Sequence, residues 1–257
     1  MHSSHFRNKF NLRGYQVVLI SLLLSVLLCT KSKAQINGSL NLPNFDNQKI
    51  HYGFMLGIHS ARFGLQYSDE FVDLELDTLH SIVPEPGLGF RIGFVANFHV
   101  FDVLDLRGGI TVTFNQLKLN YRFTNGLEQE ELIDPTYVEL PLLLKYKSIR
   151  RRNRRMYALI GLNPAFKASG TKDEDDTQER LLTNNFNLSV EFGAGFDLYQ
   201  PFFKFSPEVR YSLGLTNVLD KEQNDFSAGI KRLSIHTVSF YFTFEGGPSE
   251  LKRVKKK

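Results

Sequence analysis

Residues 185–215 constrain the fold more than any other part of this 257-residue chain. From 186 to 198 every second residue is apolar, and the residues between them are polar or very small. After a short connection through Pro201, the same alternation resumes at 203 and continues to 215. Successive side chains of a strand point to opposite faces, so the pattern predicts a β-hairpin with one apolar and one polar face.

The length of this hairpin favours a membrane. Each arm has about 13 residues, roughly twice the usual length of a strand in a soluble domain. A tilted strand that crosses a bilayer needs about 9–11 residues. The stretch is therefore typical of a membrane β-barrel.

Residues 1–34 predict a secretory signal peptide. Basic residues up to Arg13 precede an apolar run at 17–29, and Ser32-x-Ala34 completes a cleavage pattern. The run is too short to favour a transmembrane helix.

Cys29, the only cysteine, raises the alternative of a lipoprotein. Leu28 occupies the preceding position, where lipidation signals favour a small residue, so we do not expect lipidation. Without the signal peptide the chain has no cysteine and no disulfide framework.

The rest of the chain divides into a short periplasmic lead (35–50), a barrel (51–245) and a basic tail (246–257). Alternation predicts eight strands, at 52–67, 88–98, 106–121, 137–146, 156–167, 186–198, 203–215 and 238–244. In the first strand the apolar residues change parity, which predicts a β-bulge near Ser60. In the third strand we expect Leu117, Leu119 and Tyr121 to continue the apolar face after a slip in parity.

The connections alternate between long and short, and the long ones are acidic. Outer-membrane barrels have long extracellular loops, short periplasmic turns and, with an even number of strands, both termini in the periplasm. The sequence thus predicts an all-β, eight-stranded, antiparallel, up-and-down transmembrane β-barrel in a Gram-negative outer membrane. An arginine-rich turn at 150–155 then falls on the periplasmic side.

The polar face decides which side of the barrel is inside. It is rich in Gly, Ser, Thr and Asn, which suit the narrow interior of an eight-stranded barrel, whereas the opposite face carries bulky Phe, Leu, Ile and Val. A soluble barrel of the lipocalin type would have the reverse arrangement. The charged residues expected inside are Arg91, Arg107, Lys145, Lys204, Arg210, Glu139, Glu191, Asp197 and Glu208.

Unpaired buried charge is very costly, so the near balance of signs predicts a salt-bridge network that fills the lumen. Glu191, Glu208 and Arg210 form the expected central cluster, with a role as scaffold and not as a reactive site. We therefore do not expect an open pore.

Signals for other chemistry are weak. Gly193-Ala194-Gly195 lies within a strand, the histidines lack metal-ligand spacing, and the acidic run at 173–176 lacks the glycine of a calcium loop. The basic clusters at 150–155 and 252–257 come without a nucleic-acid-binding motif. We expect no catalytic, cofactor-binding or metal site, no enzyme activity, no cofactor, no nucleic-acid partner and no small-molecule substrate.

Four stretches carry a family resemblance: 41–46 (NLPNFD), 84–90 (PEPGLGF), 137–146 (YVELPLLLKY) and 202–215 (FFKFSPEVRYSLGL). Together they resemble the PorT family, outer-membrane components of the type IX secretion system of Bacteroidota, over residues 40–245. The lysine-rich tail departs from that pattern.

The resemblance implies a role in the export of proteinases and adhesins, and in gliding motility. It also implies protein partners in a secretion translocon, besides the outer-membrane lipids. Because a barrel this narrow cannot pass a folded cargo, we expect an accessory or assembly factor. The alternatives are a porin-like channel, a structural barrel unrelated to secretion, and a barrel enzyme that acts on lipid or peptide.

Overall fold

The computed structural model describes residues 40–68, 79–124, 126–168, 183–220 and 229–246. The expected signal peptide, the tail after Gly246 and the acidic stretches at 69–78 and 169–182 lie outside these ranges. The described residues form one short 3₁₀ helix and twelve strands. Their bounds are η2 Phe45–Asn47, β1 Ile50–Tyr67, β2 Leu79–Glu85, β3 Gly87–Phe101, β4 Leu104–Phe114, β5 Leu117–Phe123, β6 Glu128–Ile133, β7 Thr136–Glu139, β8 Leu142–Lys147, β9 Arg154–Lys167, β10 Phe186–Tyr199, β11 Lys204–Gly214 and β12 Ile230–Gly246.

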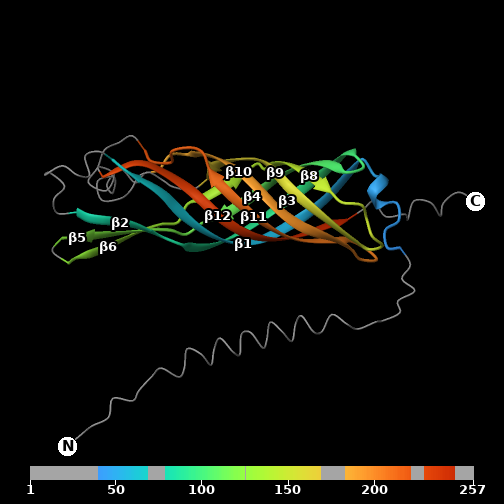
Figure 1. The fold of residues 1–257 in the computed structure, drawn as a ribbon, viewed down its shortest axis with the longest axis horizontal. Helices are drawn as coiled ribbons and strands as arrows, with labels where there is room; N and C mark the ends of the chain where they lie inside the picture. The colour runs from blue at the N-terminus through green and yellow to red at the C-terminus, as the bar shows by residue number, and fades with distance from the viewer. Residues whose placement is uncertain (1–39, 69–78, 125, 169–182, 221–228, 247–257) are drawn as a thin grey trace, which may run out of the picture. The chain divides into compact units, whose positions relative to one another are not determined.

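Nine of these strands form a closed antiparallel barrel (Figure 1). Around the ring the order is β1, β3, β4, β7 with β8, β9, β10, β11 and β12, and β12 pairs with β1. Strands β7 and β8 share one place between β4 and β9, separated only by Leu140 and Pro141. Proline has no N–H for the ladder, which accounts for the interruption. The predicted eight-stranded up-and-down barrel is confirmed, and closure leaves the ring no free edge.

The two faces of the barrel follow the alternation in the sequence. Phe94 is 74% exposed on the outer face, whereas Lys145 is 0% exposed on the inner face. Large apolar side chains cover the outside on every strand of the ring, and no helix in the described residues is long and apolar enough to cross a membrane. The predicted assignment of faces is therefore confirmed.

Small residues make the interior possible. A Cβ atom added at Gly195 would lie 2.5 Å from the Tyr157 hydroxyl, so glycine on β10 lets this tyrosine pass over the adjacent strand to Glu208 on β11. The same position would bring a Cβ within 2.7 Å of the Glu208 side chain. The glycines of the polar face thus create the space that larger luminal side chains occupy.

The bulge predicted near Ser60 is wrong. Strand β1 pairs with β12 residue by residue from Tyr52 to Gln66, and the only shift in their register lies between Gln66 and Tyr67. The parity changes because Ala61 and Phe63 point inward and are buried, not because a residue is inserted.

The expected continuation of the third strand is also wrong. Strand β4 ends at Phe114, and β5 pairs with β2 and β6 in a separate three-stranded sheet (Figure 1). Strands β2 and β6 lie in stretches predicted to be loops. Charged residues of β6 form ion pairs within this sheet: Glu130 pairs with Lys118 and Glu128 with Arg122 of β5.

A hydrophobic core fills the barrel at the end that carries this sheet, which we call the loop end. Its members are Ala61, Phe63, Ile82, Leu117, Leu119, Tyr121, Tyr137, Ala165, Val218, Ile230, Leu233 and Ile235. Outward-facing residues at the same height, such as Arg62 and Arg232, are polar and exposed. Apolar side chains therefore change from the outer to the inner face toward the loop end.

Candidate functional site

Twelve charged side chains are buried in the lumen below the hydrophobic core, six of each sign. The cations are Arg91, Arg107, Lys145, Lys147, Lys204 and Arg210, and the anions are Asp105, Glu139, Glu191, Asp197, Glu208 and Glu245. All nine residues predicted to face inward are among them. The alternation of the strands places each one inside, because their neighbours in sequence face outward.

Arg107 is the centre of the half of this network that lies farther from the loop end. Its guanidinium lies 2.8 Å from Glu208 and 3.3 Å from Glu245, and its Nε donates a hydrogen bond to Asn97. Glu245 also pairs with Lys204 at 2.7 Å. Side chains from opposite walls of the barrel are thus joined across the lumen.

Lys145 connects this centre to an aromatic side chain. Its Nζ lies 2.8 Å from Asp197 and 3.7 Å from the centre of the Tyr157 ring, a cation–π contact. The Tyr157 hydroxyl in turn donates a 2.6 Å hydrogen bond to Glu208. The ring therefore fills the lumen between charges that it also helps to neutralise.

The predicted cluster of Glu191, Glu208 and Arg210 is confirmed. Arg210 pairs with both carboxylates, and Arg91 lies 3.7 Å from Glu191. The two ends of the Arg210 guanidinium hold the carboxylates of adjacent strands, β10 and β11, so the cluster ties these strands together.

Three members of the network are absent from the nine charged residues that the sequence predicts inside: Asp105, Lys147 and Glu245. Asp105 and Lys147 pair with each other at 2.5 Å, and Glu245 joins Arg107 to Lys204. The alternation of the last strand did indicate that Glu245 faces inward, because it continues the polar series Ser239, Tyr241 and Thr243. With these three the luminal network has six charges of each sign, apart from Arg155 at the mouth, which pairs with Asp46 of residues 41–48.

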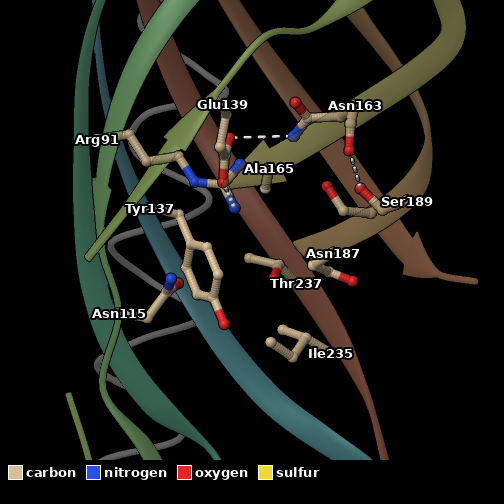
Figure 2. A pocket seen from close by; sticks show the side chains of 11 residues that line it. Arg91, Asn115, Tyr137, Glu139, Asn163, Ala165, Asn187, Ser189, Ile235 and Thr237 are labelled. Carbon is tan, nitrogen blue, oxygen red and sulfur yellow. Dashed lines mark hydrogen bonds and ion pairs between the residues drawn. The ribbon is translucent and has the colours of Figure 1, made fainter. Parts of the chain in front are cut away.

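A small cavity lies where the ionic network meets the hydrophobic core (Figure 2). Its volume is about 20 Å³, room for about one water molecule. Asn163 borders it and donates hydrogen bonds of 3.0 Å to both Glu139 and Glu191. Tyr137 and Ile235 of the hydrophobic core form the opposite side.

At the other end of the barrel, which we call the turn end, residues 41–48 form a strap over the mouth. The Phe45 side chain is 2% exposed, stacks on His51 at 4.1 Å and meets Tyr199 edge to face. Lys204 lies 4.8 Å from the centre of the Phe45 ring. The sequence predicted only loop chemistry here, and nothing in it indicated a contact with the barrel.

An ionic clasp fastens the strap. The Asp46 carboxylate lies 3.1 Å from both Arg150 and Arg155 and accepts a 2.8 Å hydrogen bond from the Tyr199 hydroxyl. Burial alone raises the pKa of Asp46, but Arg155, Tyr199 and Arg150 together hold it below its ordinary value of 3.8. Asp46 is therefore charged at neutral pH.

Arg150 and Arg155 belong to the β8–β9 connection, which with its flanks (150–155) we call the arginine turn. Arg150 also donates to the Leu42 and Asn41 carbonyls and lies over the Tyr199 ring. The predicted arginine cluster is thus a hairpin in contact with the strap.

Among the described residues, no group of three or more His, Cys, Asp or Glu is arranged to hold a metal ion. The acidic run at 173–176 lies outside them. His59 bonds to Asn115 at 2.8 Å, inside the barrel.

A closed antiparallel barrel with an apolar exterior and a polar, charged interior defines the class of transmembrane β-barrels. The chain belongs to the family of the outer membrane protein beta-barrel domain, which matches residues 34–220. It is an outer-membrane protein. The sequence matches none of the curated proteins with which it was compared.

Several solved structures of outer-membrane barrels are distantly similar to this chain. OprG from Pseudomonas aeruginosa is 14% identical, with 76% of this chain and 94% of that chain covered, at a TM-score of 0.41. Neisserial surface protein A is 12% identical (76% and 96% covered, TM-score 0.40). The outer membrane protease OmpT from Escherichia coli is 10% identical (76% and 95% covered, TM-score 0.38). These likenesses are too distant to assign a function.

Proposed function

We propose that this protein is a non-conducting accessory or assembly component of the type IX secretion system, similar to PorT. It serves the export of secreted proteinases and adhesins, and gliding motility in cells that glide. The turn end faces the periplasm and the loop end faces the outside. Four stretches of sequence support this assignment. Two of them form the strap (41–46) and the barrel strand β11, whose alternate side chains face the lumen (202–215).

The filled lumen is the observation that carries the accessory role. Arg107 bridges Glu208 and Glu245 across the barrel, and Phe45 of the strap covers the mouth below them. A barrel filled in this way leaves its loops and turns as the surfaces for partners in a translocon. Outer-membrane lipids surround its apolar face.

Deletion of the gene in its own host tests the role. We expect cargo proteins to be retained in the periplasm, and wild-type protein supplied from a plasmid to restore their secretion. A deletion strain with an intact envelope and normal secretion contradicts the proposal.

The second candidate is a porin-like channel for small solutes, the alternative that the sequence left open for a transmembrane barrel. Planar-bilayer recordings distinguish the two. The purified protein should give no steady conductance, because the charges that line the lumen are paired with each other. Steady single-channel currents favour the channel instead.

We also propose that the inward carboxylates are structural and not catalytic. Glu191 is engaged by Arg210, Arg91, Asn163 and Ser212, which leaves it little freedom to transfer protons. Glu208 is likewise held by Arg107, Arg210 and Tyr157.

A further inference from the structure

The arginine turn differs from the other two short connections at its end of the barrel. Those connections expose apolar tips, with Phe101 63% and Phe202 88% exposed. The β8–β9 connection also exposes one apolar residue, Ile149 at 82%, but its tip exposes Arg151, Arg152 and Arg154, and the other two connections carry no basic residue. Within the described residues, the side chains of these three arginines have no hydrogen-bond or ion-pair partner.

The backbone of this turn has a fixed shape. Arg151 and Arg154 exchange two backbone hydrogen bonds, of 2.9 and 3.2 Å, which close a two-residue hairpin loop. Arg152 adopts a positive φ of 56°, and the Asn153 side chain accepts a 2.9 Å hydrogen bond from the backbone N–H of Asn41 in the strap. The strap therefore holds the turn while the three guanidinium groups remain free.

The turn already binds a carboxylate from its own chain. Arg150 and Arg155 hold Asp46, one on each oxygen, at 3.1 Å. The strap segment also gives two backbone carbonyls to Arg150, as a bound peptide would. Planar guanidinium groups match carboxylates in this way better than a point charge does.

We propose that the arginine turn is a docking site for an acidic segment of a periplasmic protein, whose Asp and Glu carboxylates pair with Arg151, Arg152 and Arg154. The inference rests on the proposed function, which places the turn end in the periplasm. Anionic lipid headgroups are the less favoured partner, because they would meet all three short turns alike, whereas only the arginine turn among them carries basic residues.

Binding is measured with the purified protein in nanodiscs of zwitterionic phosphatidylcholine and a fluorescein-labelled peptide of twelve alternating Asp and Glu residues. We expect salt-sensitive binding that R151Q/R152Q/R154Q weakens by about tenfold or more. The matched control, R62Q/K231Q/R232Q, removes three exposed basic residues from the loop end and should bind like wild type.

Two further comparisons separate docking from unspecific attraction. R151K/R152K/R154K keeps the charge but loses the planar fork, so it should still bind several-fold more weakly than wild type. The proposal is contradicted if the lysine variant binds as tightly as wild type. It is also contradicted if the loop-end control loses as much affinity as the triple glutamine variant. Competition by phosphatidylglycerol vesicles as strong as that by unlabelled peptide, at equal charge, assigns the site to lipid and overturns it.

In cells, a photo-crosslinking residue replaces Arg152 or, as a control, Asp102 of the β3–β4 turn. Mass spectrometry should find an acidic peptide joined to position 152 and not to position 102. Adducts with lipid alone, or the same peptide at both positions, contradict docking. If the triple glutamine variant secretes normally but the deletion strain does not, this inference fails while the accessory role stands.

Discussion

The Arg107 guanidinium lies 2.8 Å from the Glu208 carboxylate, although the two residues are 101 positions apart in the chain. They belong to β4 and β11, which lie four places apart in the ring of eight and hence on opposite walls. One ion pair therefore spans the barrel. Because both groups are almost completely buried, this pair connects the two walls in a setting where an unpaired charge is costly.

Replacing Arg107 by methionine should destabilise the barrel by about 3 kcal/mol, because Glu208 and Glu245 lose a shared cation while buried. The loss is measured as a lower unfolding temperature, from the shift in electrophoretic mobility after heating in detergent. The control is Arg122→Met, which removes an exposed pair with Glu128 and should cost less than about 0.5 kcal/mol. Equal effects of the two substitutions argue against a structural role for the network.

Glu191→Gln and Glu208→Gln distinguish scaffold from catalysis. Each change removes a buried charge that an arginine neutralises, so we expect each to lower the free energy of unfolding by about 2–3 kcal/mol, seen as a lower unfolding temperature. The same samples are assayed for hydrolysis of fluorogenic peptide and lipid substrates, where wild type should show none. A wild-type activity that either variant abolishes without loss of stability establishes an enzyme.

Phe63→Ala and Phe94→Ala form a matched pair. Phe63 is 2% exposed in the core at the loop end, whereas Phe94 is 74% exposed on the apolar outer face of the neighbouring strand in the ring. Removing the Phe63 ring leaves a cavity and should cost about 3–5 kcal/mol, and the change at Phe94 about 1 kcal/mol or less. The two unfolding temperatures, measured in the same detergent, should differ by several degrees. An equal loss at both positions contradicts a packed interior at the loop end.

The clasp on the strap should weaken in acid. The pKa of Asp46 is lowered on folding, so its contribution is complete above about pH 3.8 and is lost as the pH falls through the lowered value. A nitroxide label on Asn47→Cys reports strap motion by electron paramagnetic resonance. We expect an immobilised spectrum at pH 7 that becomes more mobile as the pH is lowered below 3.8.

Asp46→Asn in the same labelled protein is the control for that experiment. It should show a mobile strap already at pH 7, with little further change in acid. A strap that stays immobilised in the Asn variant contradicts the role of the clasp, and points to Phe45 packing as the main attachment.

The alternation in the sequence predicted the strands, their number in the ring and the face on which most side chains lie. It also placed all nine of the predicted luminal charges inside, because a period of two is a property of the single strand. Which charge meets which is a different matter. The Arg107–Glu208 pair depends on the stagger between strands around the closed ring, and no local pattern contains that stagger.

The errors share one physical cause. Ala61 with Phe63, and Leu117 with Tyr121, were assigned to the outer face because apolar residues in the middle of the barrel face lipid. Toward the loop end, beyond the belt of exposed apolar side chains, the same residue types are stable only inside, so the side they occupy depends on their position along the barrel axis. The strap was missed for a related reason, since the contacts of Phe45 and Asp46 are with residues more than 100 positions away, apart from the stacking on His51.

The change of apolar side chains from the outer to the inner face, between Ile58 and Ala61 on β1 and between Val238 and Ile235 on β12, fixes the depth of immersion. A shift of the barrel along its axis toward the loop end would expose outward-facing aromatic side chains near the turn end, such as Tyr52, to water. A shift in the opposite direction would carry Arg62 and Arg232 into the acyl chains. The protein is therefore held at one level along the bilayer normal. The three-stranded sheet, which lies at the loop end, is therefore held outside the acyl chains.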